Sequence, residues 1–191
     1  MSESKPPHEQ LIVADVAAWR AWLDANENDS DGVWLVLAKK GTQIPTTLSY
    51  AEALQEALCS GWIDGQRKSL NETTYLQRFT PRRKNSIWSQ RNVDFISNLI
   101  SAGRLRERGN KEVLEAQADG RWERTYSGPS STEVPEDLLN ALKASPKASE
   151  IFDSLTIGER YPSLIGIVTS APDKRAAKIT KWIEKLETAN E

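Results

Sequence analysis

Six consecutive apolar residues, Val33-Trp34-Leu35-Val36-Leu37-Ala38, constrain the fold more than any other feature of the chain. A strand with one solvent face alternates apolar and polar residues, whereas this run is apolar on both faces. Its length is far below the roughly 18 apolar residues of a membrane span. We therefore expect residues 33–38 to form the buried central strand of a sheet.

Strand and helix patterns mix in the first two thirds of the chain, and only helix patterns follow. Asp15 is placed to cap a helix to about Asn26, and Ser49 with Glu52 forms a capping box for a helix to Ser60. The second predicted strand covers residues 73–79, where Thr73, Tyr75, Gln77 and Phe79 alternate with Thr74, Leu76 and Arg78. Further helices are predicted at 90–102 (capped by Ser89) and 111–119, and from starts near residues 135, 146, 157 and 172.

This order of elements predicts an α+β fold, with a small N-terminal sheet, flanking helices and an all-helical C-terminal unit. The predicted organisation is a disordered leader over residues 1–10, an α+β domain over 11–126, a linker over 127–132 and a helical domain over 133–191. The polar leader lacks a signal-peptide pattern, and the single cysteine, Cys59, cannot form an internal disulfide. We therefore expect a soluble cytoplasmic protein with no membrane insertion.

The charges are unevenly distributed although the formal net charge is only −2. Residues 1–64 carry a net charge of −6, residues 65–111 carry +8 and residues 112–191 carry −4. The basic block forms either one anion-binding face or a solvated surface paired with its acidic flanks. Arg104, Arg106 and Arg108 alternate within it and predict a solvated arm; the alternative is that they extend the basic face.

Scarcity of histidine excludes several chemistries. The one histidine, His8, lies in the polar leader, so a Ser–His–Asp triad, a Cys–His pair and a histidine-rich zinc site are all disfavoured. The chain also has no Walker glycine loop and no dinucleotide fingerprint. We assign no metal and no cofactor from the sequence.

The stretch from Arg78 to Asn92 has five basic residues and no acid. Arg82 and Arg83 follow Pro81 in a predicted loop, and a helix begins after Ser89. Guanidinium groups beside free helix N–H groups bind phosphate or carboxylate, and the Trp88 ring offers a face for stacking. The alternative is that Trp88 belongs to the core, that Ser89 is an ordinary cap and that the arginines are solvated or paired.

Two other candidates follow predicted strands. Asp64 comes after the short apolar step Trp62-Ile63 and is either a general base or metal ligand, or the first residue of an Asp-Gly turn. Lys40 lies in the Lys-Lys-Gly loop after the central strand, where a ligand contact and a solvated loop are both open.

Several runs resemble the YdeI/OmpD-associated family, also labelled bacteriocin-protection proteins. They are Trp34-Leu35-Val36-Leu37-Ala38-Lys39-Lys40-Gly41, Tyr50-Ala51-Glu52-Ala53-Leu54, Ala57-Leu58-Cys59-Ser60-Gly61-Trp62-Ile63-Asp64-Gly65, Arg78-Phe79-Thr80-Pro81-Arg82-Arg83, and Trp88-Ser89 with Asn92. The resemblance covers roughly residues 11–187 and implies the family's helical C-terminal domain from about residue 134. It departs at Ser60, where the family commonly has an aromatic residue, and at residues 170–175.

The resemblance implies that one site contains the candidate residues, and the family names imply a role in envelope stress or tolerance of bacteriocins and antimicrobial peptides. The leading hypothesis is a basic cleft that binds an anionic small molecule or nucleotide, with Asp64 as the candidate base and no reaction assigned. The alternatives are a nucleic-acid-binding module that uses residues 65–111, and a protein-interaction factor without a small-molecule ligand. The candidate ligand-binding residues are Lys40, Arg78, Arg82, Arg83, Trp88, Ser89 and Asn92.

Overall fold

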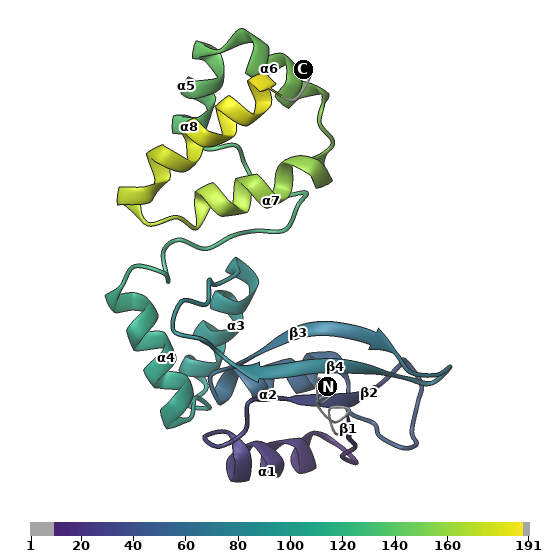
Figure 1. Cartoon of the computed structure of the whole chain (residues 1–191). Helices are drawn as coiled ribbons and strands as arrows, with labels where there is room; N and C mark the ends of the chain where they lie inside the picture. Colours follow the sequence, from purple (N-terminus) through teal and green to yellow (C-terminus); the bar gives the residue numbers. More distant parts are fainter. Residues whose placement is uncertain (1–9, 189–191) are drawn as a thin grey trace, which may run out of the picture. The chain divides into compact units, whose positions relative to one another are not determined.

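The structure is a computed structural model of the chain that describes residues 10–188 (Figure 1). Its contacts define two compact units, which are described separately below. The first contains the chain up to Ser86 together with Asp94–Glu115, and the second contains Ile87–Val93 and the chain from Ala116 onward. The predicted α+β fold with an all-helical C-terminal part is confirmed. The predicted domain boundaries stay predictions, and the predicted leader lies outside the described residues except for Gln10.

The first unit contains a four-stranded mixed sheet (Figure 1). The strands are β1 (Gln10–Leu11), β2 (Val33–Ala38), β3 (Trp62–Ser69) and β4 (Thr74–Pro81), in the order β1-β2-β4-β3. Strand β2 is parallel to β1 and antiparallel to β4, and the side chains of residues 33–37 are all buried. The prediction of a buried central strand at residues 33–38 is therefore confirmed.

Helices α1 (Val16–Asn26) and α2 (Tyr50–Cys59) pack on the face of the sheet that carries Phe79. The Trp19 ring joins the layers, since it lies 5.6 Å from the ring of Phe79 and its indole N–H donates to the carbonyl of Ala53. Both predicted helix starts are confirmed. The Asp15 carboxylate accepts from the backbone N–H of Ala18, and the Ser49–Glu52 capping box is complete.

The interpretation of Asp64-Gly65 as a turn is wrong, because both residues lie within β3. The strand continues through both residues, and Asp64 pairs with Phe79 while Arg67 pairs with Gln77, so β3 has one residue more than β4 between these pairs. This is a β-bulge, which a glycine accommodates as readily as it does a turn. The Gln77 side-chain amide donates to the carbonyls of Gly65 (2.8 Å) and Gln66 (3.3 Å), which satisfies backbone groups that the ladder leaves unpaired.

Two more helices, α3 (Gln90–Ser101) and α4 (Glu107–Ala118), follow the sheet. The predicted solvated arm at residues 104–108 is wrong for two of its arginines. Arg104 and Arg106 both contact the carboxylate of Glu56, which is 3% exposed on α2 and also accepts from Arg20. A buried carboxylate of this kind requires cationic partners, and these arginines supply them.

The second unit contains the four C-terminal helices, α5 (Glu136–Ala144), α6 (Pro146–Ser154), α7 (Ile157–Val168) and α8 (Pro172–Thr188). The Ser145 cap of α6 and the Thr156–Glu159 capping box of α7 occur where the sequence predicts helix starts. The rings of Phe152 and Trp182 meet edge to face at 5.5 Å. The buried core consists of Leu138, Leu142, Ala148, Phe152, Leu164, Ile167, Ile179, Trp182 and Leu186.

The α5–α8 contact predicts an acid-sensitive contribution to stability. Arg175 donates to both carboxylate oxygens of Asp137, and this hydrogen bonding lowers the pKa of Asp137 below its ordinary value. A lowered folded-state pKa stabilises the fold above the unfolded-state pKa, near 3.9, and this stabilisation is lost as pH falls through the folded-state value. We expect Asp137→Asn to lower the urea midpoint at pH 7, and the difference from the unchanged chain to shrink as the pH falls below about 3.9. Equal midpoints at pH 7 would contradict this.

Candidate anion-binding cleft

A cleft of about 710 Å³ opens at the carboxyl end of β2. Three of the described residues that line it are cationic, and none is acidic. The lining comes from the loop after β2, the first turn of α2 and the β3–β4 hairpin. It consists of Ala38, Lys39, Lys40, Gly41, Thr42, Gln43, Thr47, Ser49, Tyr50, Ala51, Arg67 and Tyr75.

The loop after β2 is a tight turn that exposes Lys40. The N–H of Thr42 donates to the carbonyl of Lys39 at 3.0 Å, and Gly41 has φ of +87°, as the third residue of a type II turn requires. The Lys39 ammonium donates to the carbonyl of Asn71 at 2.7 Å, so this lysine fixes the loop to the β3–β4 hairpin. Lys40 occupies the exposed corner of the turn and makes no ion pair with any residue that the structure describes.

The first turn of α2 connects the cleft to Asp64. Tyr50, the first residue of α2, lines the cleft, and its hydroxyl donates to Oδ2 of Asp64 at 2.8 Å. Asp64 is half-buried and is not itself a lining residue. The carboxylate therefore orients the Tyr50 hydroxyl at the cleft wall.

Arg67 enters the cleft because of the bulge in β3. Asp64 and Arg67 are three positions apart, so a regular strand would direct them to opposite faces. Because of the extra residue, Asp64 pairs with Phe79 and Arg67 pairs with Gln77. Phe79 and Gln77 are on the helix-covered face of β4, so Asp64 and Arg67 are on that face too. The Arg67 guanidinium carbon lies 4.0 Å from the centroid of the Tyr75 ring. Burial raises the pKa of the Tyr75 hydroxyl, and the charge of Arg67 acts in the opposite direction.

The structure brings none of the predicted arginines to this cleft. Arg82 and Arg83 follow the end of β4, which is opposite the start of β2, so the eight residues of β4 separate them from Lys40 by roughly 25 Å. The Arg82 side chain is buried, whereas Arg83 is exposed in a turn closed by Ser86.

Arg78 lies on the sheet face opposite the helices, since its register partner Trp34 points away from Phe79. Its guanidinium reaches toward the carbonyl of Asp31, with 3.5 Å between the nitrogen and the oxygen. Burial lowers the pKa of Arg78, and Asp31 partly offsets this. Arg78 therefore closes over the Asp31-Gly32 turn and is separated from the cleft by the sheet.

The remaining predicted residues belong to the second unit. Trp88 is 1% exposed, and its ring meets that of Trp122 edge to face at 5.0 Å. Ser89 caps α3, since its hydroxyl accepts from the N–H of Asn92 at 3.2 Å, and the N–H of Gln90 donates to the carbonyl of Tyr126. These protein contacts occupy helix N–H groups that the sequence prediction assigns to an anion.

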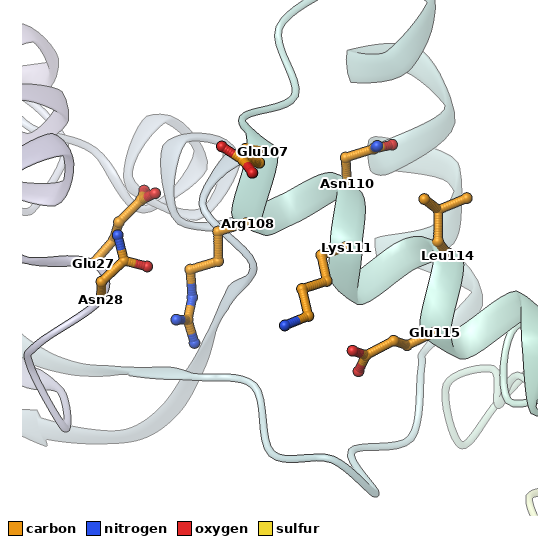
Figure 2. A pocket seen from close by; sticks show the side chains of 8 residues that line it. All are labelled: Glu27, Asn28, Glu107, Arg108, Asn110, Lys111, Leu114 and Glu115. Atoms are coloured by element: carbon orange, nitrogen blue, oxygen red, sulfur yellow. The ribbon is translucent and has the colours of Figure 1, made fainter.

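A second hollow, of about 600 Å³, lies between the end of α1 and the exposed side of α4 (Figure 2). Glu107, Lys111 and Glu115 follow one another at four-residue spacing along α4, so acids and bases alternate on this side. Glu27 and Arg108 add one further charge of each sign. The lining therefore has three acids and two bases, which disfavours an anion and contrasts with the acid-free cleft at β2.

Sequence reasoning missed Tyr50, Arg67 and Tyr75. Tyr50 follows the recognised Ser49 cap directly, so its place at the start of α2 was predictable, although its partner Asp64 was not. Arg67 required knowledge of the bulge, for which the only local signal is Gly65 within a polar strand, and Tyr75 required the pairing of β4 with β2.

Two family models match the chain, one over each part of it. The model described as Domain of unknown function (DUF8412) matches residues 11–112, and the chain belongs to this family. The model described as Bacteriocin-protection, YdeI or OmpD-Associated (OmdA) matches residues 131–188, so the helices α5 to α8 form an OmdA domain. The family resemblance is thereby confirmed over residues 131–188, whereas all the motifs quoted for it lie within the DUF8412 match. No curated protein and no solved structure matches the chain significantly.

Across residues 10–188, no helix is long and apolar enough to cross a membrane. The same part of the chain has no cluster of three or more His, Cys, Asp or Glu side chains arranged to hold a metal ion.

Proposed function

We propose that the first unit binds a phosphate-bearing small molecule in the cleft at the end of β2. The observation that carries this proposal is the lining, with Lys39, Lys40 and Arg67 from two separate segments and no acid. Lys40 supplies a mobile point charge, and Arg67 supplies a planar guanidinium that can bind two phosphate oxygens at once. The pairing suits a phosphate group that enters between the turn and the hairpin.

In this proposal Tyr50 and Asp64 position the ligand rather than transform it. The Tyr50 hydroxyl donates its proton to Asp64, which holds the hydroxyl oxygen at the cleft wall beside the proposed phosphate. Asp64 does not line the cleft itself, and it orients the ligand only through its hydrogen bond with Tyr50. The role of Asp64 as a base stays a prediction.

The OmdA domain supports a biological setting for this binding activity. We propose that the chain contributes to tolerance of bacteriocins or antimicrobial peptides, because the description of the matching family names bacteriocin protection. We place the chain in the cytoplasm in this proposal, since its single cysteine, Cys59, is free and buried.

The nucleic-acid alternative has weaker support than the small-anion proposal. It requires the basic block at residues 65–111 to present one face. Arg104 and Arg106 instead contact the carboxylate of Glu56. Arg78 and Arg67 lie on opposite faces of the sheet. These arginines therefore do not form one basic surface.

The test is a thermal-shift panel on the full chain with phosphate, sulfate, nucleotides, sugar phosphates and short oligonucleotides, each at low and high salt. We expect at least one small phosphate compound to raise the melting temperature at both salt concentrations, because ligands that bind the native state stabilise it. Lys40→Ala should reduce the shift, while Lys84→Ala, which removes an exposed lysine outside the cleft, should preserve it. A shift confined to oligonucleotides at low salt would refute the small-anion proposal.

A further inference from the structure

The OmdA domain has a basic groove of its own, separate from the cleft in the first unit. The groove runs between α7 and α8 and encloses about 230 Å³. Three lysines line it, and none of its lining residues is acidic. The lining consists of Ser163, Gly166, Ile167, Lys178, Lys181, Trp182 and Lys185.

The lysines form a continuous stripe along α8. With 3.6 residues per turn, Lys174, Lys178, Lys181 and Lys185 fall within an arc of about 60°. All four are exposed, and none makes an ion pair with any described residue. The acids of α8 project on the side of the stripe away from Trp182; they are Asp173, Glu184 and Glu187. Lys178 donates to the carbonyl of Gly166 at 2.9 Å, and no acidic side chain lines the groove to neutralise the lysines.

The floor of the groove is apolar and has room for a side chain. Ile167 and Trp182 form the floor and are buried, so neither projects from the surface. Gly166 lies in the interior of α7, and a Cβ added to it would meet no atom within 4 Å. Glycine is unfavourable at such a position, and any larger side chain would occupy this open space.

We propose that this groove binds an acidic peptide segment of a partner protein that inserts one large apolar side chain. The lysine stripe pairs with carboxylates, and the slot beside Gly166 receives the apolar anchor, as buried anchors do at other interfaces. A membrane surface fits less well because it requires projecting apolar side chains. A nucleic acid fits less well because the Trp182 ring is 7% exposed and offers no face for a base.

The experiment selects a phage-displayed library of random 12-residue peptides against the full chain. We expect enrichment of peptides that combine several Asp or Glu residues with one large apolar residue. Replacing that apolar residue by alanine in a synthetic copy should weaken binding about tenfold or more. No enrichment of acidic peptides, or no effect of the alanine replacement, would overturn the proposal.

Chain variants test the location. The double variant Lys178→Glu/Lys181→Glu should weaken peptide binding about tenfold or more, while Lys84→Glu/Lys143→Glu, which makes the same charge change at exposed sites elsewhere, should not. Gly166→Leu should block the anchor and keep every lysine, whereas Gly166→Ala should bind normally and raise the melting temperature. If the double variant fails to fold, Gly166→Leu decides the outcome alone.

Two further probes test the alternative partners, a membrane and a nucleic acid. The variant Lys40→Ala tests whether peptide binding is independent of the proposed anion-binding cleft. Vesicles with anionic lipids and a single-stranded oligonucleotide should both bind more weakly than the selected peptide. Equal or tighter binding of either probe through Lys178 and Lys181 would overturn the peptide proposal. Lys40→Ala should leave peptide binding unchanged, so failure of the anion-binding cleft does not affect this result.

Discussion

Replacing Glu56 by alanine is expected to lower the free energy of unfolding of the first unit by about 3–5 kcal/mol, the usual cost of removing one member of a buried ion cluster. Glu56 is 3% exposed, and its carboxylate contacts the guanidinium groups of Arg20, Arg104 and Arg106. Arg106 also donates to the backbone carbonyl of Glu56 and to the carboxylate of Asp24. The substitution would remove the carboxylate that separates the guanidinium groups of Arg20 and Arg104. Their positive charges would then repel each other and destabilise the fold.

Urea denaturation of the full chain at pH 7 measures this effect, with the exposed Glu72→Ala as the matched control. Arg106→Ala should cost more than Arg20→Ala, because the Arg106 side chain is 17% exposed and the Arg20 side chain is 48% exposed. If Glu56→Ala lowers the free energy of unfolding by less than about 1 kcal/mol, the cluster contributes no more than an exposed ion pair, and the prediction is wrong.

Features governed by neighbouring residues were predictable from the sequence. The caps at Asp15 and Ser49 occur as expected, and Ser145 and Thr156 cap helices at the predicted starts, because a cap depends on a side chain and a backbone N–H three residues away. The central strand at residues 33–38 was predictable for a similar reason, since its apolar character on both faces is a local property of the sequence.

Features that depend on distant partners were not predictable. Asp64-Gly65 has the same local signal for a turn and for a bulge, and only the pairing of β3 with β4 decides between them. Arg104 and Arg106 are ordinary surface residues in the sequence until α2 places Glu56 beside them, 48 and 50 residues earlier in the chain. The candidate site was incomplete for the same reason, because the antiparallel pairing of β2 with β4 separates Lys40 from Arg83.

Arg67→Ala should weaken binding of the phosphate compound that the thermal-shift panel identifies by about 1.5–3 kcal/mol, or roughly 10- to 150-fold in Kd. The bulge turns Arg67 to the helix-covered face, where its guanidinium lies against Tyr75 and lines the acid-free cleft.

Titration calorimetry of the full chain measures this loss, and Arg67→Lys should recover part of the affinity because it keeps the charge without the bidentate geometry. Arg83→Ala is the matched control, since Arg83 is exposed and lies beyond the opposite end of β4. If Arg83→Ala weakens binding and Arg67→Ala does not, the anion binds near the Pro81 end of β4. Binding at the cleft requires the reverse, because Arg67 lines the cleft together with Lys40 and Arg83 does not.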